Sequence, residues 1–118
     1  MIDIRKHIVD LILHATGLYC YYIYPPQEAE LPCIAYNEVT NDDHIIALNN
    51  EYANIAYTFT IYANNPLEIF ATAEQIDEAM RYEGFIKDYT SPDMYADGAY
   101  YKTLRFRAII NDRDEKYN

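Results

Sequence analysis

Residues 51–64 have the sequence EYANIAYTFTIYAN, in which apolar and mostly polar side chains alternate over the whole length. Because successive side chains of a β-strand point to opposite faces, a period of two predicts a strand with one buried face. We therefore expect this segment to be the central strand of a sheet. The residues expected on its buried face are Ala53, Ile55, Tyr57, Phe59 and Ile61.

Two helices are predicted around this strand. Asn65 is a typical N-cap residue, Pro66 suits a first helical position, and Glu68 stands where a capping glutamate is expected. Gly84 is expected to end this helix, and Gly17 to end an earlier one over residues 3–15. The apolar stripes at helical spacing are Ile69, Ala73, Ile76 and Met80 in the later helix, and Ile4, Ile8, Leu11, Ile12 and Ala15 in the earlier one.

The other segments complete an α+β pattern. Thr40–Asp43 is predicted to form a turn, and residues 44–50 favour neither helix nor strand. The expected fold is an antiparallel sheet of four to five strands with two helices packed on one face, in the order α-β-β-(β)-α-β-β. We expect one domain over residues 1–110 and a charged, frayed tail over 111–118. The further predicted strands are 19–24, 33–39, 85–89 and 100–110, the last two as a terminal hairpin.

Composition argues against several classes of protein. No apolar run approaches the roughly 20 residues of a membrane helix, and the first residues lack a secretory signal, so synthesis in the cytoplasm is expected. Three scattered glycines and a single serine, Ser91, provide neither a phosphate-binding loop nor a nucleophile elbow. Cys20 and Cys33 are expected to be reduced and partly buried, with a disulfide as the alternative if their strands form a hairpin.

One interpretation of the sequence is a small metal-dependent or hydrolytic enzyme. His7, Asp10 and His14 lie at i, i+3 and i+7, which places three possible metal ligands on one side of the first helix. A solvated polar face explains the same spacing, because this helix already has an apolar stripe and no motif adds a further ligand. We therefore predict no catalytic residues, no metal and no cofactor.

The charge distribution favours contact between copies of the chain. The formal net charge is −10, and no Lys or Arg occurs between Lys6 and Arg81. Such a charge repels a nucleic-acid backbone, and a polarity along the chain suits head-to-tail contact. A solvated acidic surface without a partner is the alternative. The chain has fourteen tyrosines and no tryptophan, a composition that suits surfaces exposed to solvent in the free protein and buried in a complex. The alternative is that many of these tyrosines lie on the sheet of a single subunit.

Two groups of residues are predicted to contact a partner. Arg105 and Arg107 share one face of the last strand, where they pair either with acids of the same subunit or with an acidic neighbour. The short apolar run after the predicted turn is expected to be covered by a neighbouring subunit. The interface residues predicted there are Asp42, Asp43, Ile45, Ile46 and Leu48.

The layout resembles the tail terminator and tail-to-head joining proteins of long-tailed bacteriophages and prophages. The resemblance spans about residues 2–110 and depends on the order and spacing of its segments. These are the N-terminal helix, LPCIAY at 31–36, YTFTIY at 57–62, a helix that ends in MRYEGF at 80–85, and YYKTLRF at 100–106.

The resemblance implies a structural protein without catalytic residues. It implies a ring, commonly sixfold, that caps the tail tube and joins the tail to the head. The implied partners are further copies of the chain, the tail tube protein and a head-completion protein. The implied locations are the host cytoplasm during assembly and then the head-tail junction of the virion. A head-tail connector or tail tube subunit is the neighbouring alternative.

Overall fold

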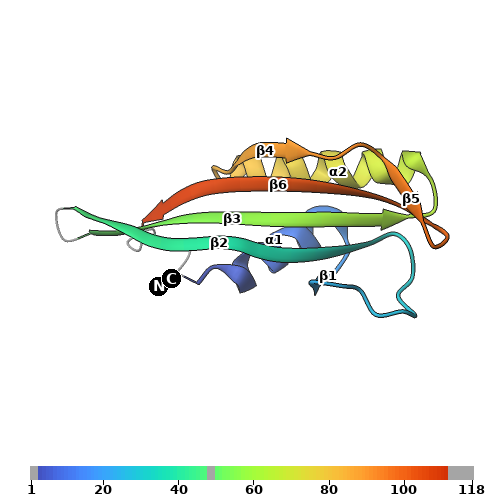
Figure 1. Cartoon of the computed structure of the whole chain (residues 1–118), viewed down its shortest axis with the longest axis horizontal. Coiled ribbons are helices and arrows are strands. Elements are labelled where there is room, and N and C mark those ends of the chain that lie inside the picture. Colours follow the sequence, from blue (N-terminus) through green and yellow to red (C-terminus); the bar gives the residue numbers. More distant parts are fainter. Residues whose placement is uncertain (1–2, 48–49, 112–118) are drawn as a thin grey trace.

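The computed structural model describes the backbone of residues 3–47 and 50–111, and the side chains of residues 3–40 and 53–110. Its two helices and six strands confirm the α+β class (Figure 1). In chain order they are α1 (Arg5–Thr16), β1 (Cys20–Tyr22), β2 (Cys33–Ala47), β3 (Asn50–Ala63), α2 (Pro66–Tyr82), β4 (Ile86–Thr90), β5 (Met94–Ala96) and β6 (Ala99–Asn111).

The sheet has the strand order β1-β2-β3-β6-β4, and β5 pairs with the start of β6. β3 is central, as predicted, and it pairs antiparallel with β2 on one side and β6 on the other. β1 instead pairs parallel with β2, so the sheet is mixed and has more strands than expected. The physical reason is that residues 23–32 carry the chain back along the sheet, so that β2 starts beside the start of β1.

The predicted turn at Thr40–Asp43 is wrong. β2 continues through these residues to Ala47, whose partner in β3 is Asn50. Two register shifts, between Glu38 and Thr40 and between Asp43 and Ile45, interrupt the pairing but do not end it. Polar residues favour turns by composition, but here the backbone of β3 provides hydrogen-bonding partners that continue the strand. Residues 48 and 49, between the two strands, lie outside the described residues.

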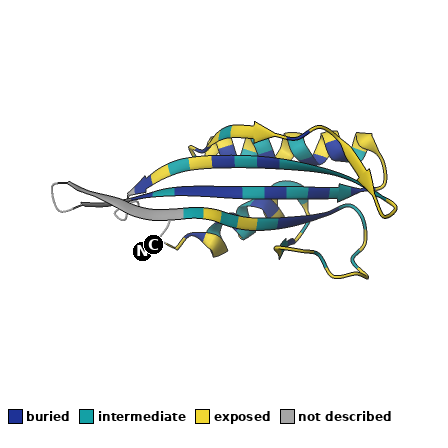
Figure 2. Ribbon diagram, in the orientation of Figure 1, coloured by how far each residue is buried: buried dark blue, intermediate teal, exposed yellow. Residues whose placement is uncertain are grey.

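Both helices pack on one face of the sheet and share one core with it. The predicted inward residues of β3 are all buried, and β6 adds Leu104 and Phe106 (Figure 2). Ile8 and Ile12 of α1 and Ile76 of α2 are fully buried against them. The apolar stripes of the sequence therefore identify the faces that form the core.

The ends of both helices follow from local chemistry. Gly17 has a φ of 75° and ends α1, and its N–H donates to the Leu13 carbonyl at 2.8 Å. At the start of α2, the Asn65 side chain accepts a hydrogen bond from the Glu68 N–H at 3.0 Å. The Glu68 carboxylate in turn accepts from the N–H of Asn64 at 2.8 Å, one residue before the cap. These bonds satisfy donors that have no partner inside the helix.

The two cysteines are free and buried. Cys20 pairs in register with Ile34 and lies in the core, whereas Cys33 precedes Ile34 and points to the opposite face. The two cysteines form no disulfide with each other, and the hairpin that would have brought them together is absent because β1 and β2 pair parallel. Burial raises the pKa of the Cys20 thiol to about 12.

The cap of α2 generates a stability prediction. Asn65→Ala should lower the free energy of unfolding by about 1 kcal/mol, because the Glu68 N–H loses its acceptor. Asn65→Asp retains an acceptor at the same place and should stay close to the wild type. Urea unfolding followed by circular dichroism measures both, and an alanine variant with an unchanged midpoint would contradict this account of the helix start.

Candidate functional site

The face of the sheet opposite the helices is the candidate site, and we call it the open face. No helix covers it in the part of the chain that the structure describes, because both helices lie on the other side (Figure 1). Alternation along β3 and β6 dictates its composition, since each residue between two core residues points outward. Along the two strands it carries Thr58, Thr60, Tyr62, Tyr101, Thr103, Arg105, Arg107 and Ile109.

A groove lies at the end of the open face where β6 begins. Its volume is about 640 Å³. Tyr62 and Tyr101 stack in its floor with ring centroids 6.2 Å apart, and Thr60 and Thr103 share an oxygen–oxygen hydrogen bond of 3.1 Å beside them. The loop containing Pro25 and Pro26 borders the groove together with the β5–β6 turn. The groove therefore offers aromatic surface with hydroxyl groups to a ligand or partner.

A charged cluster lies next to the groove along β6. Asp88 Oδ1 accepts a hydrogen bond from Arg105 Nε at 2.9 Å, and Asp88 Oδ2 lies 2.7 Å from Arg107 Nε. A register shift between Lys87 and Tyr89 sets Asp88 between the two arginines. The Arg105 hydrogen bond, supported by both guanidinium charges, lowers the pKa of Asp88. One carboxylate faces two cations, so the cluster keeps one net positive charge.

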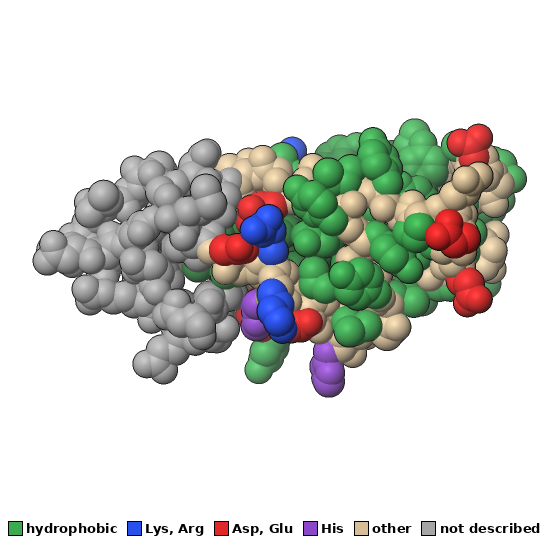
Figure 3. All heavy atoms as spheres, turned by 90° about the horizontal axis from the view of Figure 1, so that it is seen from below, with side chains coloured by type: hydrophobic (Ala, Val, Ile, Leu, Met, Phe, Trp, Pro, Cys, Tyr) green, Lys and Arg blue, Asp and Glu red, His purple; other side chains and the backbone are tan. Residues whose placement is uncertain are grey.

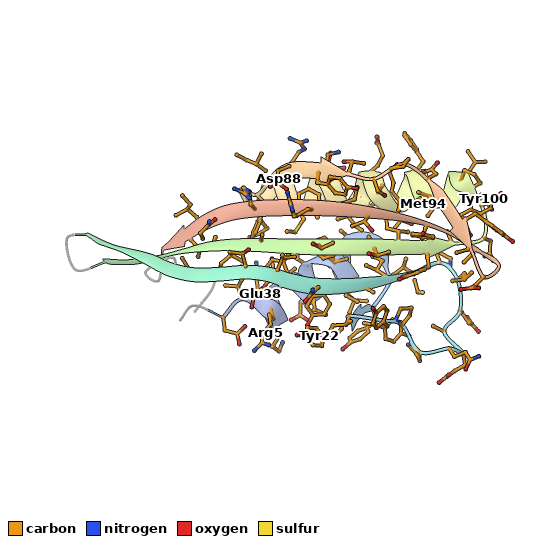
Figure 4. All side chains as sticks on the ribbon, viewed as in Figure 1. Arg5, Tyr22, Glu38, Asp88, Met94 and Tyr100 are labelled. Carbon is orange, nitrogen blue, oxygen red and sulfur yellow. The ribbon has the colours of Figure 1, made fainter. Side chains whose placement is uncertain are left out.

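A second surface lies at the β1 edge of the sheet, where Arg5, Tyr22 and Glu38 come from three elements (Figure 4). Arg5 pairs with Asp3 at 2.8 Å, and Glu38 accepts a hydrogen bond from the Tyr57 hydroxyl at 2.9 Å. Burial, together with Glu38, raises the pKa of Tyr57. Figure 3, which views this side of the molecule, shows hydrophobic side chains gathered there, and Tyr19, Tyr22 and Tyr24 are among the exposed ones.

The three possible metal ligands of α1 have other environments. His7 Nε2 lies 3.1 Å from Glu83 Oε2, Asp10 accepts from Lys6 Nζ at 2.9 Å, and His14 is exposed. Among the described side chains, no three His, Cys, Asp or Glu groups lie close enough to hold one metal ion. Helical spacing thus placed these residues on one side of α1 without bringing them together as a ligand set.

The predicted interface residues fall into two groups. Arg105 and Arg107 lie on the open face. Two kinds of partner were predicted for them, and the structure shows the first, an acid of the same chain: Asp88 pairs with both arginines. Asp42, Asp43, Ile45 and Ile46 belong to the backbone of β2, but their side chains lie outside the described residues, as does all of Leu48.

Sequence reasoning missed Asp88. The segment was predicted as a strand, but a simple alternation cannot place Asp88, because the register shift changes the face on which it lies. One feature of the sequence could have identified Asp88. The predicted terminal hairpin brings its strand beside Arg105 and Arg107, whose two positive charges favour a nearby anion.

Comparisons with known proteins give no assignment. No protein-family model matches the sequence, and no curated protein matches it significantly. Among the described residues, no helix is long and apolar enough to cross a membrane.

The charged cluster generates a pH prediction. The pKa of Asp88 is lower in the folded protein than in the unfolded chain, so its stabilising contribution is present above the unfolded value and lost as the pH falls through the folded one. Asp88→Asn should therefore lower the free energy of unfolding at neutral pH, by about 0.2–1 kcal/mol for each exposed pair. The difference from the wild type should shrink below about pH 4.

Urea unfolding at neutral pH and at about pH 3 measures this difference. Glu28→Gln is the control, because Glu28 is an exposed loop acid with no cation partner among the described residues. A difference between Asp88→Asn and wild type that is independent of pH would contradict the ionic origin of the effect.

Proposed function

We propose that the protein is a structural subunit of a ring that terminates a bacteriophage tail and joins it to the head. The observation that carries the proposal is the open face: the helices cover one side of the sheet, and the other side presents an aromatic groove and a positively charged cluster. A domain of two layers with an uncovered sheet face offers a second copy a large contact surface.

The segment order supports the same proposal. The elements α1, β2, β3, α2 and β6 lie at the segments on which the resemblance to tail terminators rests. The net charge of −10 also suits a channel for DNA, because like charge prevents adhesion of the passing nucleic acid. The proposed partners are other copies of the chain, the tail tube protein and a head-completion protein, and the proposed locations are the host cytoplasm and then the head-tail junction.

Inactivation of the gene in the phage or prophage that carries it tests the function. We expect filled heads and separate tails of irregular length, because unfinished tube ends neither stop growing nor accept heads. Electron microscopy of the lysate measures tail length and the fraction of joined particles, and purified protein added to the separate tails should restore joining. Joined virions at wild-type frequency, without the protein in the particle, would refute the proposal.

Assembly should depend on the tail. A terminator that polymerised freely would compete with its own docking onto the tube. Purified protein at micromolar concentration should therefore sediment mainly as monomers or small oligomers, and rings should form on tube ends. Open filaments growing from the purified protein alone would contradict this prediction.

A further inference from the structure

The side of α2 that faces away from the sheet exposes several large apolar side chains to solvent. Leu67 and Phe70 are 82% and 65% exposed, and Tyr82 at the other end of the helix is 87% exposed. Glu74 and Glu78 lie between them. The five residues follow i, i+3 and i+4 steps, so they form one stripe along the helix, which we call the outer stripe.

The two acids of the outer stripe, Glu74 and Glu78, form no ion pair within the part of the chain that the structure describes. Neither carboxylate contacts a Lys or Arg among the described residues, and the nearby Arg81 pairs with Asp77 at 2.8 Å. Two like charges at i and i+4 repel each other, which weakens a helix unless an external cation compensates. The middle of the outer stripe therefore carries two negative charges between apolar ends.

The open face has the complementary order along β6. The groove floor at Tyr101 and Thr103 comes first, Arg105 and Arg107 follow, and Ile109, which is 63% exposed, comes last. Both surfaces thus present an aromatic or apolar region at each end and a charged region in the middle, and the charges in the middle have opposite signs.

The spacings of the two patterns agree. At 1.5 Å per helical residue, the outer stripe places its acids about 11 Å beyond Leu67 and Phe70, and Tyr82 about 9 Å further on. At about 3.3 Å per strand residue, β6 places its arginines about 13 Å beyond the groove floor, and Ile109 about 10 Å further on. The three contacts can therefore be made together.

We propose that the outer stripe of α2 in one copy packs on the open face of a second copy of this chain. Leu67 and Phe70 enter the groove, Glu74 and Glu78 meet the Arg105–Arg107 cluster, and Tyr82 covers Ile109. This inference rests on the ring assembly proposed above and identifies the surfaces that build the ring.

The chain direction makes the contact a repeating one. Within one chain, α2 already runs alongside β6 in the same direction: it begins after Ala63, which pairs with Tyr100, and ends before Ile86, which pairs with Arg107 (Figure 1). The proposed neighbour's α2 has this direction too, on the opposite side of the sheet. The two copies are therefore related by a shift perpendicular to the sheet combined with a small rotation. Repetition of such a head-to-tail contact produces a ring when the rotation brings the last copy back to the first.

Charge reversal tests the pairing. The helix variant carries Glu74→Lys and Glu78→Lys, and the sheet variant carries Arg105→Glu, Arg107→Glu and Asp88→Lys, which keeps the pairs within the chain with inverted sign. Each variant alone should raise the dissociation constant for self-association by about tenfold or more, because like charges then meet. An equimolar mixture should recover association, since each variant's helix then faces a sheet of opposite charge.

The matched control is Glu28→Lys with Glu30→Lys. It changes the net charge as much as the helix variant does, but it alters two exposed loop residues that do not line the groove. Sedimentation velocity over a concentration series measures association, circular dichroism confirms that each variant folds, and ring formation on terminator-deficient tails provides a second readout.

The outcomes separate this inference from the proposed function. Loss in each variant with recovery in the mixture supports the pairing. Loss without recovery, or association unchanged by either variant, overturns the pairing of these two surfaces, while tail joining by the wild type upholds the proposed function. A wild-type protein that shows no association up to about 1 mM and forms no rings on tails overturns both.

Discussion

Burial of alternate side chains along β3 is the constraint on which the rest of the structure depends. Ile55, Tyr57 and Phe59 are fully buried, and each fully buried large apolar side chain contributes about 1.5–3 kcal/mol. They belong to one buried cluster with core residues of both helices and with Leu104 and Phe106 of β6. A slip of one residue in β3 would turn this whole set to the other face, so the core also determines the register of both neighbouring strands.

The candidate site follows from that register. Leu104 and Phe106 must point inward to complete the core, so Arg105 and Arg107 must point outward. The same alternation sets Tyr101 and Thr103 on the open face at the start of β6. Only Asp88 needs an additional feature, the register shift in β4, which brings a carboxylate between two cations that would otherwise repel each other.

The sequence was sufficient to predict those features that depend on residues close together in the chain. The Asn65 cap, the Gly17 end and the inward face of β3 all depend on residues close in sequence, and all three were confirmed. The predicted turn at Thr40–Asp43 failed because a strand far longer than its apolar segment is stabilised by the backbone of its partner. The parallel pairing of β1 and the position of Asp88 likewise depend on contacts between segments, which periodicity alone does not contain.

The shared carboxylate also bears on how strongly copies of the chain can associate. Asp88 neutralises one of the two arginine charges within the subunit, so an incoming acid gains less than it would from two free guanidinium groups. A single contact of this kind is weak and sensitive to salt, because its charges remain close to solvent. In the proposed ring the contact repeats at every subunit, and the end of the proposed tail tube, by holding several copies side by side, raises their effective concentration. Each contact is weak alone, and the contacts become stable only when several form together. A subunit of the proposed ring with such contacts remains unassembled until a finished tail is present.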